Sequence, residues 1–268
     1  MKPDRIERAH LRDPRDLSHT MHRYHPPAEL TGLVQRFWIP VWSVEPGREA
    51  VQRVLQYPCA LLVVAPDYAR FYGVVSGLST TTLTGDGWAV GVMCEPAGGW
   101  LIAGRSMAEF RDRFVDLAEV LDDAAAVERD VREAMTSPRQ ADSHAAATAR
   151  MSDVLRRFLP VDDEGRQVNE VVAFVEQHPD VVRVAQVGER FDLTERALQR
   201  LVRRRVGLSP KWLIQRRRLQ EASVRLRERP ASLAEVAADL GYADQPHFTR
   251  DFRSVTGMTP GEFAARYS

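Results

Sequence analysis

A short motif that occurs twice, fifty residues apart, constrains the carboxy-terminal part of this 268-residue chain. Gly207-Leu-Ser-Pro210 returns as Gly257-Met-Thr-Pro260, and Arg200 corresponds to Arg250 at the same offset. In each copy, glycine suits the end of one helix, a hydroxyl side chain suits the cap of the next, and proline fits its first turn. Fifty residues hold three short helices, so the sequence predicts one supersecondary unit used twice.

Within each unit the apolar spacing predicts a helix, a short turn and a second helix. The second helix follows Thr194 in the first unit and Asp244 in the second. Its polar face is rich in arginine and glutamine, which pair with guanine and adenine edges in the major groove. These outward residues are Arg196, Gln199, Arg200, Arg203 and Arg204 in the first unit, and Gln245, Thr249, Arg250 and Arg253 in the second. The pattern therefore predicts two DNA-reading helices.

The stretches LTERALQRLVRRRVGLSPKWLIQRRRLQEA and SLAEVAADLGYADQPHFTRDFRSVTGMTPGEFA resemble the AraC/XylS family of bacterial transcription regulators, over about residues 168–268. The resemblance implies seven helices, with two helix-turn-helix units joined by a long helix at about Pro210–Arg227. Two recognition helices would then enter successive major grooves about 34 Å apart. The resemblance also implies double-stranded operator DNA and RNA polymerase as partners, with a homodimer as a further option.

Position by position, the resemblance implies a specific set of base-reading residues. These are Arg196, Gln199 and Arg200 in the first unit, and Gln245, Pro246, Thr249 and Arg250 in the second. Pro246 departs from the usual chemistry, because its ring offers only apolar contact, for instance to a thymine methyl. Asp192 stands where relatives commonly have glycine in the turn, and aspartate tolerates left-handed geometry.

Charge divides the chain into two halves although its net charge is zero. Residues 1–165 hold 19 Lys and Arg against 24 Asp and Glu, whereas residues 166–268 hold 18 against 13. The basic half suits a polyanion, and the acidic half could mask it. The runs Arg203–Arg205 and Arg216–Arg218 point around a helix, so we expect either a phosphate contact from at least one residue of each run or a solvated face.

The sequence of the first half predicts strands rather than helices. Together with the helical second half, this makes the whole chain an α+β protein. Short apolar runs bounded by turn signals predict strands that suit a β-barrel or sandwich. The runs are Phe37–Val44, Ala60–Ala65, Phe71–Val75 and Trp88–Met93. The segments LVQRFW and GDGWAVGVMCEPAGGW resemble the β-rich, cupin-like amino-terminal domains of some AraC-like regulators, which implies effector binding or dimerisation.

Helical periodicity replaces the strand pattern after about Met107. We expect one helix from there to Met135, a break at Ser137-Pro138, and a second helix at about 141–159. The two helices would pack on the barrel or supply a dimer seam. These elements complete a β-rich domain at 1–160, followed by a linker at 161–167 and the DNA-binding domain at 168–268.

Aromatic side chains of the first half are candidates for an effector pocket, with ordinary barrel core as the alternative. They are Trp38, Trp42, Tyr57, Trp88 and Trp100. The spacing His19-x-x-His22-x-x-His25 could place three imidazoles on one helix face for a metal, but Pro26-Pro27 follows and favours an extended segment, so we expect loop or interdomain polar contacts instead. Cys59 and Cys94 lie beside apolar runs, so we expect inert buried thiols rather than redox sensors.

Enzymatic alternatives lack their motifs in this sequence. The His-x-His pattern of metal-binding cupins is missing, and two cysteines cannot form the four-thiolate site of an alkyl-transfer repair protein. GxSxG, Walker and GxGxxG patterns are missing too. We expect no catalytic residue, cofactor or metal, and weigh a DNA-binding regulator against a cupin-type or repair enzyme fused to a DNA-binding domain, or a regulator controlled only by a protein partner. Neither an apolar leader nor an apolar run long enough for a membrane span occurs, so we expect a cytoplasmic protein.

Overall fold

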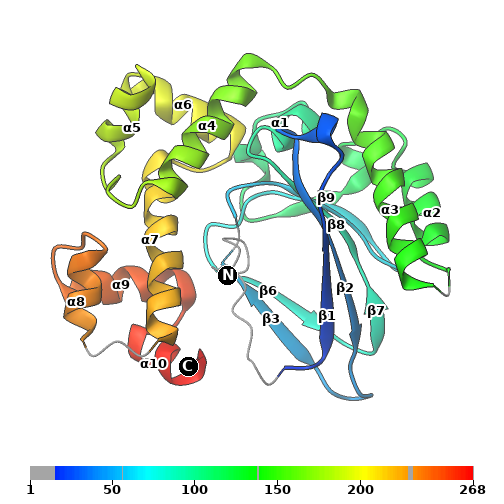
Figure 1. Ribbon diagram of the computed structural model, residues 1–268, viewed down its shortest axis with the longest axis horizontal. Coiled ribbons are helices and arrows are strands. Elements are labelled where there is room, and N and C mark those ends of the chain that lie inside the picture. Colours follow the sequence, from blue (N-terminus) through cyan, green and yellow to red (C-terminus); the bar gives the residue numbers. More distant parts are fainter. Residues whose placement is uncertain (1–15, 56, 138, 229–231, 268) are drawn as a thin grey trace.

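Antiparallel strands of the first half form one large sheet and one small one (Figure 1). The structure is a computed structural model that describes residues 16–55, 57–137, 139–228 and 232–267. The large sheet has the order β1-β2-β8-β4-β5-β9, with β7 paired to β2, and β3 pairs with β6 in the small sheet. The large sheet contains β1 (His19–Tyr24), β2 (Val34–Ser43), β4 (Leu61–Val64), β5 (Ala69–Tyr72), β7 (Asp86–Trp88), β8 (Val90–Cys94) and β9 (Phe114–Asp116). The small sheet contains β3 (Ala50–Val54) and β6 (Ser79–Leu83).

The two faces of the large sheet pack against different partners, because side chains alternate along each strand. Phe37 and Ile39 of β2 are buried and share a core with Val131 and Met151 from the covering helices. Trp38 lies on the opposite face, toward β3 and β6. The covering helices are α2 (Ala124–Ala134) and α3 (Gln140–Leu155), which η5 (Arg156–Phe158) extends. The predicted β-rich first domain is therefore confirmed, and its two helices pack on the sheet.

The helix predicted from Met107 to Met135 is wrong over its first half. The chain instead forms η3 (Met107–Phe110), strand β9, and η4 (Leu117–Glu119), and becomes α-helical only at Ala124. Asp112 has a left-handed φ of 59°, which ends the first turn, and its carboxylate accepts hydrogen bonds from the Ser76 backbone and hydroxyl at 2.6 and 2.8 Å. The edge of β5 then takes β9 as its partner, with Tyr72 opposite Phe114. Pro138 of the predicted Ser137-Pro138 break lies outside the described residues.

The second half is helical, and its described residues form the seven helices that the family resemblance implies. They are α4 (Asp163–Gln177), α5 (Val184–Phe191), α6 (Glu195–Arg205), α7 (Pro210–Arg227), α8 (Leu233–Asp239), α9 (Gln245–Thr256) and α10 (Pro260–Tyr267). Helix α7 has the expected bounds, because the Ser209 hydroxyl accepts a hydrogen bond from the Trp212 backbone N–H at 3.2 Å and Pro210 occupies the first turn.

The predicted linker at 161–167 is mostly helical. The Asp162 carboxylate caps α4 by accepting a hydrogen bond from the Gly165 backbone N–H at 3.0 Å. An N-terminal cap of this kind satisfies donors that the first helical turn leaves free. Only a short connection therefore separates the helical half from η5.

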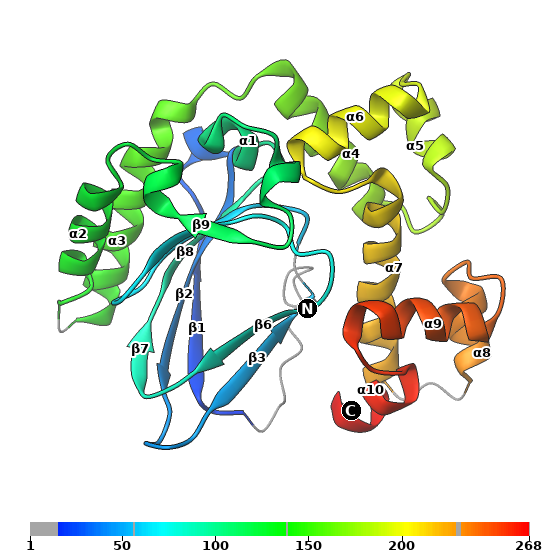
Figure 2. The same ribbon diagram turned by 180° about the vertical axis from the view of Figure 1, so that it is seen from behind.

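The two halves share buried surface rather than meeting through a linker. One continuous apolar cluster includes strand residues such as Phe37, residues of α6 such as Leu198, and Ile214 near the start of α7. The second helical unit has its own cluster, which takes in Leu55 of the β-rich half. Short elements at the junction are η2 (Ala28–Leu30) and α1 (Gly98–Ala103). Figure 2 shows α1 beside the first unit, whereas α8, α9 and α10 surround the far end of α7. None of the described helices combines the length and apolar character needed to cross a membrane.

Candidate functional site

The first helix-turn-helix unit consists of α5 and α6 with a tight turn between them. Gly188 lets the turn approach α5, since a Cβ there would stand 2.7 Å from the Leu193 carbonyl oxygen. Asp192 has a left-handed φ of 51°, as expected for an aspartate in this position. The Thr194 hydroxyl accepts a hydrogen bond from the Ala197 backbone N–H at 3.2 Å, so α6 begins where the sequence predicts its cap. The turn fixes the direction in which α6 leaves α5.

Helix α6 separates its apolar and polar residues onto opposite faces. Leu198 and Val202 are fully buried. The predicted reading residues are all exposed: Arg196, Gln199, Arg200 and Arg203. Gln199 donates a hydrogen bond to the Glu195 carboxylate at 3.1 Å, which orders its amide along the outer face. The helix thus presents two guanidinium groups and one amide in a single stripe beside Arg203.

The second unit, α8 and α9, repeats this arrangement. Gly241 supplies a left-handed turn with φ 74°, and the Asp244 carboxylate accepts a hydrogen bond from the His247 backbone N–H at 2.7 Å. Phe248 and Phe252 fill the interior. The predicted reading residues Gln245, Pro246, Arg250 and Arg253 are exposed, and Thr249 is half-buried. Both units therefore expose arginine and glutamine side chains, the residue types that the sequence analysis expects to contact DNA bases.

Helix α7 holds the two units apart. Its 18 residues span about 27 Å. Figure 1 shows α6 near one end of α7 and α9 near the other. Adjacent turns of a DNA major groove are about 34 Å apart.

The arginine run at the end of α6 is largely structural. Arg205 is only 2% exposed, forms ion pairs with Asp162 and Glu164, and lies 4.0 Å from the centre of the Trp100 ring. Arg204 also pairs with Glu164. Arg205 therefore neither contacts phosphate nor lies on a solvated face, because tertiary packing turns that side of the helix inward, and exposed Arg203 is left as the candidate of this run for the predicted contact.

The run on α7 is also turned inward. Arg216 is 3% exposed and Arg217 is 8% exposed. Arg217 donates a hydrogen bond to the Val181 carbonyl oxygen at 2.8 Å, and the Arg218 guanidinium lies 3.6 Å from the centre of the Tyr242 ring. Burial lowers the pKa of Arg216 to about 9. Arg216 and Arg217 therefore serve contacts within the protein and neither reach phosphate nor form a solvated face.

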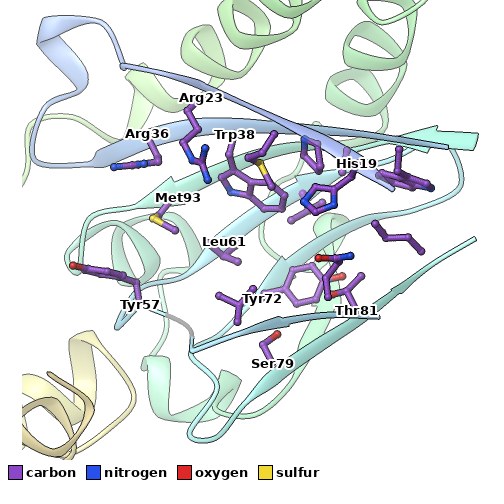
Figure 3. Close-up of a pocket in the computed structure, with 18 of the residues that line it drawn as sticks. His19, Arg23, Arg36, Trp38, Tyr57, Leu61, Tyr72, Ser79, Thr81 and Met93 are labelled. Atoms are coloured by element: carbon purple, nitrogen blue, oxygen red, sulfur yellow. The ribbon is translucent and has the colours of Figure 1, made fainter. Parts of the chain in front are cut away.

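A cavity of about 210 Å³ lies between the large sheet and the β3–β6 pair (Figure 3). Of the five predicted pocket residues, Trp38, Trp42 and Tyr57 line it. A Cβ on Gly91 would stand 2.1 Å from the Trp38 ring, and one on Gly87 would stand 2.4 Å from the Trp42 ring. The two indoles therefore lie flat across glycines of the neighbouring strands, where any larger residue would displace them.

The structure places Trp88 and Trp100 outside this cavity. Ala89 lines the cavity, and Trp88, which precedes it, packs against the main core instead, because neighbouring strand residues face opposite sides. Trp100 belongs to α1 and packs beneath Arg205. Of the five predicted pocket residues, these two do not line this cavity.

The cavity also has polar residues that the sequence analysis did not single out. Arg23 of β1 and Arg36 of β2 line it together with His19 and Gln52. The period-two alternation His19-Met21-Arg23 would have placed these side chains on one face of a strand, but the sequence analysis considered only the histidines of this segment and expected loop or interdomain contacts. Strand β1 instead pairs with β2 along its whole length.

The three spaced histidines do not converge. His19 lines the cavity, whereas the ring of His22 lies 4.8 Å from that of His144 in α3, on the helix-covered side of the sheet. Within the described residues no group of three or more His, Cys, Asp or Glu side chains could hold a metal ion. Cys59 and Cys94 are buried as expected, and burial raises the pKa of both thiols.

Comparison with known proteins shows which protein family the helical half is similar to. A helix-turn-helix domain family matches residues 187–266. The HTH-type transcriptional activator RhaS of Escherichia fergusonii is 33% identical over 97 residues, which cover 36% of this chain and 35% of RhaS. RhaS of Escherichia coli strain SE11 is 32% identical over 101 residues, or 37% of this chain and 36% of that protein. The carboxy-terminal domain belongs to the AraC/XylS family.

The chain spans about a third of the length of these curated relatives. In the β-rich half, residues 22–116 match a domain of unknown function, DUF6597. Among solved structures, ToxT from Vibrio cholerae aligns over 94% of this chain and 99% of its own, with 12% identity and a TM-score of 0.41. The C-terminal domain of AraT from Geobacillus stearothermophilus aligns over 37% of this chain and 83% of its own, with 22% identity and a TM-score of 0.34.

The AraC/XylS domain is hydrogen-bonded to the β-rich domain along both α4 and α7. Asn169 accepts a hydrogen bond from the Ala97 backbone N–H at 2.9 Å and donates one to the Gly32 carbonyl oxygen at 2.7 Å. The Trp212 indole N–H donates to the Ser76 carbonyl oxygen at 3.0 Å. These contacts hold α4 and α7 against the β-rich domain.

The segment 57–59 connects the cavity with α7. Tyr57 lines the cavity and also a second cavity that Cys59 and residues of α4 border. Pro58 of this segment and Arg216 of α7 border a third, small cavity, so the buried guanidinium of the AraC/XylS domain lies close to this segment. A displacement of Tyr57 would therefore alter the packing around Arg216, in the middle of α7.

Proposed function

We propose that this chain is a sequence-specific, DNA-binding transcription regulator, and that its β-rich domain controls DNA binding by taking up a small effector. The observation that carries the proposal is the pair of helices α6 and α9, which expose matching arginine faces near the two ends of α7. Similarity to the RhaS activators supports activation of transcription rather than repression. RNA polymerase, and a second copy of the chain, belong to the proposal as partners.

In this proposal α6 and α9 enter two successive major grooves on one side of the DNA. Arg200 and Arg250 occupy equivalent positions and each donate two hydrogen bonds to a guanine. Gln199 and Gln245 suit adenine, and Pro246 suits a thymine methyl. Arg203 and Arg253, one turn further along, contact phosphate and thereby fix the register.

Binding to a duplex selected from a random pool tests this assignment with the full-length protein. Arg200→Ala and Arg250→Ala should each weaken binding to the selected site by about 5- to 150-fold, the equivalent of about 1–3 kcal/mol, and relax selectivity at one base position. Arg253→Ala should weaken binding to all sequences alike and lower the salt slope by about one.

Arg150→Ala is the matched control, because Arg150 is an exposed arginine on α3, in the other domain. It removes the same charge and should leave both affinity and selectivity unchanged. Equal losses for Arg150→Ala and Arg200→Ala would show that the protein responds only to net charge. Failure to enrich any site would refute sequence-specific binding.

The cavity supports control by a small molecule rather than by a protein partner alone. A sealed, side-chain-filled barrel would have left no room for a ligand, whereas this barrel has an aromatic-lined cavity. The effector would act through Tyr57 on Arg216 and α7, and so change the relative placement of α6 and α9. Its differential affinity for the two placements would set the size of the response.

A further inference from the structure

The β3–β6 pair forms a sheet of its own beside the cavity. Its two strands are antiparallel, with Ala50 opposite Leu83 at one end and Val54 opposite Ser79 at the other. One face of the pair lines the cavity, through Gln52, Val54, Ser79, Thr81 and Leu83. Two strands alone have little stability in water, so the position of this pair depends on the groups that it contacts.

One end of the pair reaches the core of the second helix-turn-helix unit. Leu55 and Leu78 lie directly beyond Val54 and Ser79, the last residues in register. Leu55 is fully buried, Leu78 is half-buried, and both pack in the apolar cluster that contains Phe248 and Phe252 of α9. The same two strands therefore line the cavity along their length and contact the second unit at their end.

Backbone contacts hold this end of the pair against α7 and α9. The Gln220 amide of α7 donates a hydrogen bond to the Leu55 carbonyl oxygen at 3.4 Å. A Cβ on Gly77 would stand 3.8 Å from the Val255 carbonyl oxygen, which places this loop beside the last turns of α9. Figure 2 shows the ends of β3 and β6 directed toward α7 and α9.

The first unit packs with the other sheet. Leu198 and Val202 of α6 belong to the apolar cluster that contains Phe37 of β2 and Phe71 of β5. One reading unit is thus packed with the large sheet and the other with the β3–β6 pair, and the cavity lies between these two sheets. A change in the separation of the sheets would therefore change the placement of α9 relative to α6.

We propose that Leu55 and Leu78 position the second reading helix, and that the β3–β6 pair thereby couples the width of the cavity to the placement of α9. The inference rests on the proposed function, and it adds a route to the one through Tyr57. A ligand that binds more tightly at one separation of the sheets would favour one placement of α9. Leu55 and Leu78 are positioning residues, since they act on DNA only through α9.

The test uses the full-length protein and the duplex selected from a random pool. Arg200→Ala and Arg250→Ala first assign the two halves of the duplex, because each relaxes selectivity at the base position that its helix reads. A single base-pair change is then made at each of these two positions. The native protein should bind each altered duplex about 5- to 150-fold more weakly than the selected one.

Leu78→Ala should reduce this discrimination at the α9 position by at least about threefold and leave the discrimination at the α6 position unchanged. The reason is that α9 loses a contact that holds it in place, whereas α6 keeps its own. Leu78→Met preserves the apolar volume and should restore the native pattern. A side chain that only stabilises the fold would not affect the two positions unequally.

Leu121→Ala is the matched control, because Leu121 is a buried leucine three residues before α2, in the cluster of the large sheet. It should lower Tm and leave the discrimination at both positions unchanged. If Leu78→Ala fails to fold, Leu78→Val shortens the same side chain less and should show the same unequal effect. Equal effects at both positions, native discrimination at both, or the same unequal pattern in Leu121→Ala would overturn the proposal.

The two arginine variants separate the two levels of inference. If Arg200→Ala and Arg250→Ala each relax one position but Leu78→Ala does not act selectively on the α9 position, only the positioning role fails. If no duplex is enriched, the proposed regulator function fails with it.

Discussion

Replacing Gly91 with alanine should displace the Trp38 indole from the wall of the cavity. The new Cβ would stand 2.1 Å from the ring, whereas carbon atoms in contact lie about 3.5–4.0 Å apart, so the ring must move by about 1.4 Å or more. The strand cannot absorb this movement easily, because Gly91 pairs with both Trp38 of β2 and Val63 of β4. Overpacking of this kind costs about 1–3 kcal/mol.

Thermal unfolding followed by tryptophan fluorescence measures this cost. For a chain of this size, about 1–3 kcal/mol corresponds to a fall in Tm of about 2–12 °C. Binding of the selected duplex should persist, because the displaced ring lies in the β-rich domain. Gly261→Ala is the matched control, because a Cβ there meets no atom within 4 Å and should leave Tm unchanged or slightly raised.

A double-mutant cycle identifies the cause of the cost. With Trp38→Leu in place, the clash at position 91 disappears, so Gly91→Ala should cost much less than it does in the native background. A Gly91→Ala protein with native Tm and native fluorescence would refute the packing of the indole on the glycine. Equal costs in both backgrounds would refute Trp38 as the clashing group.

Arg205 and its partner Asp162 supply two further predictions. Arg205→Met should lower the free energy of unfolding by about 1–3 kcal/mol in urea titrations, since it removes charge-assisted hydrogen bonds from carboxylates that are themselves partly solvated. Partial burial raises the pKa of Asp162, but the hydrogen bond and charge of Arg205 outweigh it, so its folded pKa lies below the ordinary value. The resulting stabilisation is present above the unfolded pKa of about 4 and is lost as pH falls through the folded pKa, so the stability difference between the native protein and Asp162→Asn should shrink from pH 6 to pH 3. A difference that is constant over this range would contradict the ion pair.

Local signals predicted the helical half well, because its boundaries depend on nearest neighbours in sequence. Ser209 with Pro210 set the start of α7, and Thr194 set the start of α6. Gly257 ends α9 with a left-handed φ of 73°. The outward faces of α6 and α9 followed from their apolar spacing alone.

Features that depend on distant partners were not accessible in the same way. The periodicity after Met107 looked helical, yet the free edge of β5 takes Phe114–Asp116 as a strand. The burial of Arg205 depends on Trp100, a hundred residues away. Which tryptophans reach the cavity depends on strand parity, and a one-residue change of register exchanges the two faces.

The unequal ties of the two reading units to the β-rich domain bear on how such a chain can be dissected or recombined. Leu198 of the first unit belongs to the same apolar cluster as Phe37, whereas the cluster of the second unit takes in Leu55 and Leu78 of the β-rich half. Cutting the chain before α4 would expose an apolar surface on the first unit and leave the second nearly intact. If a foreign sensor domain were joined at that point, the second unit would keep its own core. The new domain would have to cover the apolar surface that the first unit now buries against the strands.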